Sequence, residues 1–452
     1  MTQSPHPRNS HRHFLICFLT VLFVLWVQAI NASAASKYKV LYSFKGGNDG
    51  ASPYGGLTLD PVGNLYGATY SGGINAAGCG TGNETGCGTV FKLTHGSGGW
   101  TKSLLYAFCS QSSCLDGALP NGDMVFGTSG VLYGTTFQGG SCLSFYGCGT
   151  AFELVRDSKG HWQHTVLYEF RGGSDAVNPD GGLVFDQMGN LYGTSGGVNL
   201  PEFEDLIQFG AVFVLTPGEG GWAESVLYNF CSRKNCSDGF SPAAALVWVA
   251  GNDLYGATFY GGQEGSFACR NNGCGVLFKL TPNSKDGWME NVLHPFVGAD
   301  GTHSISALIS DDQGNLYGTT ISEGAFGDGS VFRLSRASNG NWKYSVLHEF
   351  STGRLGGDLF RSALVLDSKG NLYGTTWTGG AGGCNGQGCG LVYKLAPGAH
   401  DTWKYTDLYD FTGGPDGGWP TSRLTIDKNG NLYGVTQIGG DNENGVVFEV
   451  TP

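Results

Sequence analysis

The sequence predicts an all-β fold, a seven-bladed β-propeller built from four-stranded antiparallel blades. Three observations predict this architecture. A unit of about sixty residues recurs seven times, each unit holds four strand-like segments, and the segments at the two ends of the repeat region complement each other. We therefore expect the N-terminal strand to pair with the C-terminal blade and to close the ring.

The repeat is marked by the tripeptide Leu-Tyr-Gly, which follows a polar turn in most units. Self-similarity at a nearly fixed period is typical of repeat architectures, so these markers divide the chain after residue 36 into seven units. The seven tripeptides begin at Leu65, Leu132, Leu191, Leu254, Leu316, Leu372 and Leu432.

The third unit shows the four segments clearly, at Gly182–Asp186, Asn190–Thr194, Gly210–Leu215 and Val226–Phe230. Each is short, rich in Val, Leu, Phe and Tyr, and bounded by Gly, Asn, Asp or Pro, which is typical of β-strands. The repeat region lacks a sustained 3.6-residue apolar pattern, which disfavours helices. Short turns such as Asp367–Asn371 join the first and second segments and suit a type I turn.

The two ends of the repeat region predict closure. The region begins on a fourth-type segment, Lys39–Phe44, and ends on a third-type segment, Gly445–Val450. Pairing of these segments completes the last blade and leaves no long sheet edge exposed. The alternative is an open β-solenoid, but solenoid coils are usually shorter than this unit and need capping units.

A tryptophan precedes the fourth segment in six of the seven units. A residue that recurs once per repeat favours a structural role, so we expect these side chains to pack between neighbouring strands or blades rather than to form a site. They are Trp100, Trp162, Trp222, Trp288, Trp342 and Trp403.

The core motifs resemble those of a known family. Asn315–Thr320 (NLYGTT) and Gly88–Leu93 (GTVFKL) are similar to the GloVer tandem repeat of exported bacterial proteins, and the likeness covers about residues 38–452. The resemblance implies an exported β-propeller and supplies no catalytic or binding residues. Family members often carry a C-terminal surface anchor, whereas this sequence ends at Pro452 directly after a repeat strand, so anchoring is not expected.

Composition narrows the function classes. The 452 residues carry a net charge of −12 at pH 7, and we find no run of Lys and Arg, so binding to nucleic acid is disfavoured. Only 14% of the residues are charged and 78 are glycine, which many tight turns explain.

The N-terminus predicts export. Arg8 and Arg12 precede an apolar run, Phe14–Ile30, and the small residues Ala32–Ala34 follow at cleavage spacing. We expect residues 1–35 to be a signal peptide and residues 36–452 to be one propeller domain, secreted or periplasmic. The alternative is an uncleaved transmembrane anchor. No other segment is long and apolar enough to span a membrane.

Twelve of the thirteen cysteines lie in close pairs after the signal segment, and only Cys17 falls within it. Exported proteins meet oxidising conditions, so we expect each pair to form a local disulfide. The alternative is zinc, which needs four ligands from two such pairs. The pairs are Cys79/Cys87, Cys109/Cys114, Cys142/Cys148, Cys231/Cys236, Cys269/Cys274 and Cys384/Cys389.

Antiparallel blades send alternate connections to opposite faces, which places all six cysteine pairs and the long loops on one face. An aspartate follows each fourth segment on that face. Its simplest explanation is an Asx-type turn, and the alternative is an acidic ring that attracts cations or frames a ligand site. These candidates are Asp49, Asp116, Asp175, Asp238, Asp300, Asp358 and Asp416.

The sequence carries no phosphate loop, no His-Glu-x-x-His motif and no Gly-x-Ser-x-Gly elbow, so no catalytic residue is assigned. We expect a non-enzymatic, monomeric binding or scaffold module, without cofactor or metal, whose disulfide-rich face recognises an extracellular glycan or protein. Trp377 and Tyr260 are candidate stacking residues on that face, with loop packing as the alternative, and His303 is the histidine to test.

The other function considered is a carbohydrate-active hydrolase or lyase at the mouth of the central channel. This is an analogy with other propellers, because fold alone does not define function. A pair of carboxylates with raised pKa at the channel mouth favours it.

Overall fold

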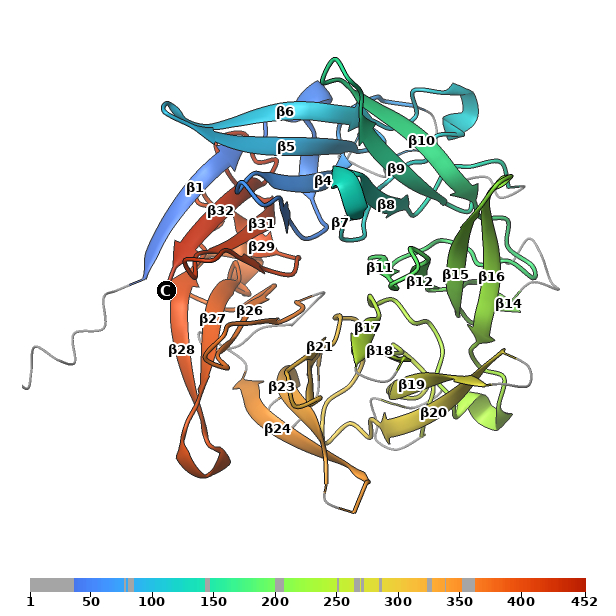
Figure 1. The fold of residues 1–452 in the computed structure, drawn as a ribbon. Helices are drawn as coiled ribbons and strands as arrows, with labels where there is room; N and C mark the ends of the chain where they lie inside the picture. The colour runs from blue at the N-terminus through green and yellow to red at the C-terminus, as the bar shows by residue number, and fades with distance from the viewer. Residues whose placement is uncertain are drawn as a thin grey trace, which may run out of the picture.

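The computed structural model describes residues 36–76, 79, 85–142, 147–199, 207–249, 252–263, 269, 272–283, 287–322, 327–337, 339–351 and 362–452. The predicted signal segment 1–35 and Asp358 lie outside these residues. Seven antiparallel sheets stand around a central axis, so the predicted seven-bladed β-propeller is confirmed (Figure 1).

Each blade runs from an inner first strand to an outer fourth strand. Blade 1 holds β2 (Ala51–Pro53), β3 (Thr58–Leu59), β4 (Leu65–Ser71), β5 (Thr89–Gly96) and β6 (Gly99–Ala107). Blade 2 holds β7 (Val125–Phe126), β8 (Leu132–Thr136), β9 (Thr150–Arg156) and β10 (Trp162–Glu169). Blade 3 holds β11 (Val184–Phe185), β12 (Leu191–Ser195), β15 (Ala211–Gly218) and β16 (Gly221–Asn229), and its loop carries the hairpin of β13 (Val198–Asn199) and β14 (Ile207–Gln208).

The remaining blades repeat this order. Blade 4 holds β17 (Val247–Val249), β18 (Asp253–Ala257), β19 (Val276–Asn283) and β20 (Gly287–Pro295). Blade 5 holds β21 (Ile309–Ser310), β22 (Leu316–Thr320), β23 (Gly327–Arg336) and β24 (Trp342–Ser351). Blade 6 holds β25 (Val365–Leu366), β26 (Leu372–Thr376), β27 (Leu391–Pro397) and β28 (Trp403–Asp410). Blade 7 holds β29 (Gly418–Pro420), β30 (Thr425–Ile426), β31 (Leu432–Ile438), β32 (Val446–Thr451) and, as its fourth strand, β1 (Lys37–Ser43).

The ring is closed by strands from opposite ends of the chain. β1 pairs antiparallel with β32, from Lys37 opposite Thr451 to Ser43 opposite Val446, and Figure 1 shows the blue strand beside the red one. Closure also uses side chains, because the aromatic ring of Tyr38 stacks on that of Tyr409 in blade 6 with 3.8 Å between centroids. The predicted pairing of the two terminal segments is confirmed.

The structure explains the Leu-Tyr-Gly marker. In blade 3, Leu191 is fully buried, and the Tyr192 hydroxyl donates to Asp186 in the turn between β11 and β12. The glycine leaves room for the neighbouring third strand, because a Cβ on Gly193 would lie 2.5 Å from the edge of the Phe213 ring. The same aromatic crowding meets Gly67, Gly134, Gly256, Gly318, Gly374 and Gly434.

Neighbouring blades meet through a repeated aromatic contact. The phenylalanine that ends each fourth-strand segment packs edge to face on the third-strand aromatic ring of the next blade, with centroids 4.9–5.9 Å apart. Every member is buried. The pairs are Phe44–Phe91, Phe108–Phe152, Phe170–Phe213, Phe230–Phe278, Phe296–Phe332, Phe350–Tyr393 and Phe411–Phe448.

The six repeated tryptophans form a second inter-blade contact. Each lies T-shaped against the Leu-Tyr-Gly tyrosine of the preceding blade, with centroids 5.9–6.3 Å apart, which agrees with the predicted packing role. The pairs are Trp100–Tyr433, Trp162–Tyr66, Trp222–Tyr133, Trp288–Tyr192, Trp342–Tyr255 and Trp403–Tyr317.

Helical structure in the described residues is confined to six short 3₁₀ turns. They are η1 (Gly47–Asp49), η2 (Ser112–Cys114), η3 (Thr128–Gly130), η4 (Lys234–Cys236), η5 (Cys384–Gly386) and η6 (Ala399–Asp401). Within the described ranges, no helix has the length and apolar character needed to cross a membrane.

The docking of the closing strand β1 can be tested through its contact with blade 1 and an equivalent contact elsewhere in the ring. Phe44 and Phe230 are 0% and 3% exposed and make the same contact with the next blade. We expect Phe44→Ala and Phe230→Ala each to lower the free energy of unfolding by about 3–5 kcal/mol, measured by urea denaturation. A negligible cost for Phe44→Ala beside a full cost for Phe230→Ala would show that the N-terminal strand is not docked.

Candidate functional site

One face of the propeller carries all the disulfides, and we call it the disulfide face. In blade 7, the start of the inner segment β29 pairs with the end of the second strand β31, Gly418 opposite Ile438. The connection that leads into a first strand and the connection that leaves a second strand therefore lie on the same face. The six predicted disulfides are present in these connections: Cys79–Cys87, Cys109–Cys114, Cys142–Cys148, Cys231–Cys236, Cys269–Cys274 and Cys384–Cys389. They indicate an oxidising, non-cytoplasmic compartment.

The repeated aspartates hold the connections that follow the fourth strands. In blade 2, Asp116 is fully buried and accepts hydrogen bonds from the Tyr106 hydroxyl (2.6 Å) and from the Ser110 N–H (2.9 Å). The other described members also accept a fourth-strand side chain and a backbone N–H: Asp49, Asp175, Asp238, Asp300 and Asp416.

These bonds place the aspartates at the outer strands. The channel at the centre of the ring is lined by other residues, and none of the six described aspartates is among them. The Asx-type turn therefore accounts for their recurrence. A role in attracting cations stays a prediction.

The central channel is narrow and polar. It encloses about 50 Å³ and is lined by residues that precede the first strand of each blade. Asp123 accepts from the Gly56 N–H at 2.5 Å and lies 3.3 Å from Arg423 Nε, while the Asn121 amide donates to Asp180 at 2.5 Å. The space suits one or two water molecules.

On the disulfide face, six described residues share an unusual backbone conformation, each two positions before a residue that lines the channel. They adopt left-handed φ values of 49–57°, and each donates its N–H to a carbonyl at the neighbouring second-to-third connection. We call them the mouth positions: Ser52, Leu119, Asn178, Ser241, His303 and Trp419. The backbone is constant while the side chains differ in size and polarity.

Aromatic side chains of blades 3, 4 and 5 gather around one of these positions. Tyr260 stacks on Phe240 with centroids 5.1 Å apart and contacts Phe259 and His303 at 4.4 and 5.4 Å. Phe209 extends the group by contacting Phe240 at 5.5 Å. All five are partly exposed. The structure thus brings the predicted candidates Tyr260 and His303 together, and we call this set the aromatic group.

Trp377, the other predicted stacking residue, lies elsewhere on the disulfide face. Its ring is 5.4 Å from that of Trp419, a mouth position of blade 7, and both are partly exposed. A third pair, Tyr54 and Tyr70 in blade 1, has centroids 5.5 Å apart. Trp377 and Tyr260 are therefore not members of one cluster, and their role in binding stays a prediction.

The opposite face, which carries the turns between first and second strands, holds clefts of ligand size. The larger encloses about 760 Å³ between blades 3 and 4 and is lined by Tyr192, Trp248, Trp288 and the 81%-exposed Met188. A second encloses about 470 Å³ between blades 7 and 1. The sequence reasoning missed Trp248, although it is the only tryptophan at its repeat position.

One pair of acids with raised pKa lies between blades 2 and 3. Glu224 on β16 is hydrogen-bonded to Asp175, and burial together with the Asp175 charge raises the pKa of Glu224 to about 7. Burial likewise raises the pKa of Asp175. Neither residue lines the channel, so this pair does not meet the condition stated for a hydrolase at the channel mouth.

The comparisons with known proteins identify the family. The model of the Gloeobacter/Verrucomicrobia repeat matches residues 32–269, 203–398 and 361–452, so the chain belongs to this family of repeat proteins. This confirms the resemblance to the GloVer repeat. No curated protein matches the chain.

Two solved structures show a distant likeness to this chain. A gluconolactonase from Xanthomonas campestris is 12% identical over 92% of this chain and 89% of that protein, with a TM-score of 0.41. A luciferin-regenerating enzyme is 13% identical over 71% of this chain and 87% of that one, with a TM-score of 0.39. Identities this low and TM-scores under 0.5 give these likenesses no weight in assigning an activity.

The acid pair predicts a pH-dependent stability. Because the pKa of folded Glu224 is above its unfolded value, the folded chain holds more protons between about pH 4.5 and 7, and stability falls as the pH rises through that window. We expect Glu224→Gln, whose amide can still donate to Asp175, to raise the free energy of unfolding at pH 8 by roughly 1 kcal/mol, because solvent screens a partly exposed carboxyl.

The measurement is urea denaturation at pH 5 and pH 8. Glu219, exposed in the hairpin turn of the same blade, provides the control Glu219→Gln, which should leave both values unchanged. Equal stability of wild type and Glu224→Gln at pH 8 would contradict the pKa assigned to Glu224.

Proposed function

We propose that this chain is an exported, non-enzymatic binding module that recognises an extracellular glycan through its disulfide face. The observation that carries the proposal is the aromatic group of Phe209, Phe240, Phe259, Tyr260 and His303, which is partly exposed on the disulfide face and includes the mouth position His303. Aromatic faces bind the apolar faces of sugar rings, and a rigid scaffold with variable loops is a common arrangement for recognition.

The backbone of the mouth positions supports this assignment. Bulky side chains in the left-handed region are uncommon, and strained conformations tend to occur where structure serves a site. His303 and Trp419 adopt this conformation, and each contacts an aromatic residue of the preceding blade. The same backbone conformation holds small polar side chains at other mouth positions, so the fold does not require aromatic side chains there.

The alternative, a carbohydrate-active hydrolase or lyase at the channel mouth, receives less support. Ligand pockets usually enclose about 300–1,000 Å³, whereas the channel encloses about 50 Å³. Asp123 is also beside Arg423 and accepts a backbone hydrogen bond. A sugar would have to react above the channel rather than within it.

The proposal predicts which side chains support binding. The mature domain is screened on a glycan array, and hits are measured by calorimetry. Because an aromatic contact contributes about 1 kcal/mol beyond its buried area, we expect Tyr260→Ala to weaken binding by roughly tenfold or more. Trp377→Ala, at a separate pair on the same face, shows whether the bound glycan also reaches blade 6.

Trp248→Ala on the opposite face is the matched control and should leave the affinity unchanged. Loss of binding in Trp248→Ala, with Tyr260→Ala unaffected, would move the site to the cleft between blades 3 and 4. Release of shortened oligosaccharides by the wild-type domain would replace the binding module with the enzyme alternative.

A further inference from the structure

Four cysteine sulfur atoms meet in blade 1. Cys79 and Cys87 belong to the connection between β4 and β5, and Cys109 and Cys114 belong to the connection that follows β6. All four sulfur atoms lie within 4.8 Å of one another. Cys79 Sγ is 3.3 Å from Cys109 Sγ and 3.9 Å from Cys114 Sγ, although each of these residues has its disulfide partner within its own loop.

This meeting is confined to one blade among the described residues. Four sulfur atoms can meet only where a blade has one cysteine pair in the connection after its second strand and another in the connection after its fourth strand. In this sequence, only blade 1 has both pairs. The pair Cys384–Cys389 shows the usual situation, because its sulfur atoms face Gly413 of the following connection. The other pairs are likewise single.

The spacing of the sulfur atoms suits a tetrahedral metal ion. A Zn–S bond of about 2.3 Å places the sulfur atoms of a tetrahedral site about 3.8 Å apart. The distances from Cys79 Sγ to Cys109 Sγ and Cys114 Sγ bracket this value, and breaking the two disulfides lets the bonded sulfur atoms separate to it. Cys109 and Cys114 are separated by four residues, which is within the range found in zinc sites. Cys79 and Cys87 lie eight positions apart in the sequence, a wider spacing than this range.

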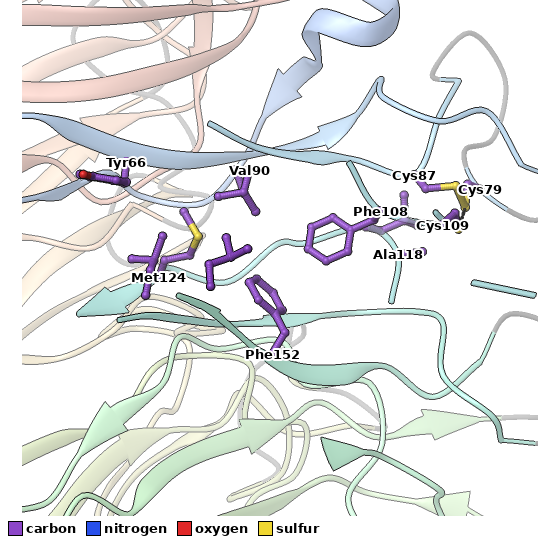
Figure 2. Packing of buried hydrophobic residues seen from close by; sticks show 13 residues of the cluster. Tyr66, Cys79, Cys87, Val90, Phe108, Cys109, Ala118, Met124 and Phe152 are labelled. Carbon is purple, nitrogen blue, oxygen red and sulfur yellow. Dashed lines mark hydrogen bonds between the residues drawn. A yellow bond between two sulfur atoms is a disulfide. The ribbon is translucent and has the colours of Figure 1, made fainter. Parts of the chain in front are cut away.

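The surroundings of the sulfur atoms are those of a closed structural site. Cys79, Cys87 and Cys109 are 8%, 0% and 7% exposed, and Phe108 and Ala118 belong to the same buried cluster (Figure 2). Structural zinc sites are closed and use four protein ligands. Thiolate ligands also favour Zn²⁺ over hard ions such as Ca²⁺ or Mg²⁺.

The loop that carries Cys109 and Cys114 is held by bonds other than its disulfide. Asp116 accepts from the Tyr106 hydroxyl, the Ser110 N–H and the Ser110 hydroxyl. The equivalent loop after β16 has the same three bonds to Asp238 and the same left-handed cysteines, Cys231 and Cys236, without a second pair nearby. The loop is therefore formed independently of the second pair. On reduction, the two sulfur atoms of each former disulfide move apart, while the bonds to Asp116 still hold the loop that carries Cys109 and Cys114.

We propose that the thiol form of Cys79, Cys87, Cys109 and Cys114 is a tetrathiolate site for Zn²⁺, and that the two disulfides are its oxidised form. A phosphine reductant converts each disulfide with one water into two thiols and becomes a phosphine oxide. Zn²⁺ then displaces the four thiol protons and binds the four thiolates. The two loops of blade 1 are thus held either by two disulfides or by one Zn²⁺ ion.

The test uses the full mature chain, reduced with a water-soluble phosphine in the presence of Zn²⁺ and freed of excess metal without oxygen. Metal analysis should find one Zn²⁺ per chain, and Co²⁺ in its place should give the absorption of a tetrahedral thiolate complex. Cys79→Ser/Cys87→Ser and Cys109→Ser/Cys114→Ser should each lose this metal. Cys231→Ser/Cys236→Ser, which alters the equivalent loop, should retain it.

Circular dichroism shows whether each sample stays folded. Cys114→Ser, which changes the most exposed of the four, provides a milder variant and should weaken Zn²⁺ binding at least tenfold. The proposal is overturned if the reduced chain binds no more Zn²⁺ than the Cys79→Ser/Cys87→Ser variant, or if Cys231→Ser/Cys236→Ser loses the metal as well. Loss of the β-sheet spectrum on reduction with Zn²⁺ present also overturns it, because the site must then be absent.

Discussion

The contact between the fourth-strand phenylalanine of one blade and the third-strand aromatic ring of the next is the interaction on which the architecture depends. It occurs at all seven seams, including the one where Phe44 meets Phe91 and the ends of the chain share a blade. Each pair is buried and contributes beyond its apolar area. The glycine of Leu-Tyr-Gly follows from it, because only a residue without Cβ leaves space for the aromatic ring.

This repeated frame separates stability from surface variation. The backbone bonds of the mouth positions are the same from blade to blade, yet their side chains range from Ser52 to Trp419. Loops on a rigid scaffold can change side chains without changing the core, which is why binding residues concentrate there. The aromatic side chains at the mouth positions occur in only some of the described blades. The repeated tryptophans, in contrast, each contact the same repeat residue, the tyrosine of Leu-Tyr-Gly.

Periodicity explains how much could be predicted. The strand order, the closure by Lys39–Phe44 and the six disulfides followed from spacings within the sequence, because a repeat fixes which segments are equivalent. The packing role of the tryptophans followed in the same way. The sequence predicted that the aspartates form turns. It did not predict that they lie at the outer strands, because this position is set by side-chain hydrogen bonds such as that from Tyr106 to Asp116.

The features that escaped prediction depend on contacts between different loops or blades. Nothing in the spacing of Cys79/Cys87 and Cys109/Cys114 shows that their loops touch, since this requires knowing that both emerge at one face of the same blade. The channel residues Asp123 and Arg423 replace small residues at a repeat position. Aligning the seven units and noting such departures would have found them, and would also have found Trp248.

The seams between blades 2 and 3 and between blades 3 and 4 share a departure from the seam between blades 7 and 1. At the position on the outer strand that faces the preceding aspartate, Lys102 offers Asp49 an ion pair at 2.9 Å. Blade 3 has Glu224 at this position and blade 4 has Glu290. At the seam between blades 3 and 4, the Glu290 carboxyl is fully buried, is held by Arg233 at 2.7 Å, and burial raises its pKa to about 7. Burying this acid near Asp238 costs free energy, which the ion pair with Arg233 offsets in part.

The same seam carries the Phe209–Phe240 contact on the disulfide face and the Trp248 cleft on the opposite face. Sites of function commonly coincide with positions where a protein departs from its most stable sequence. Because the seven seams are equivalent, they can be compared with one another within one molecule. The seam between blades 3 and 4 keeps the aromatic contact of Phe230 with Phe278 but lacks an ion pair like that of Lys102 with Asp49. The departure is therefore confined to polar side chains outside the aromatic contact, and the constraint that closes the ring is left intact.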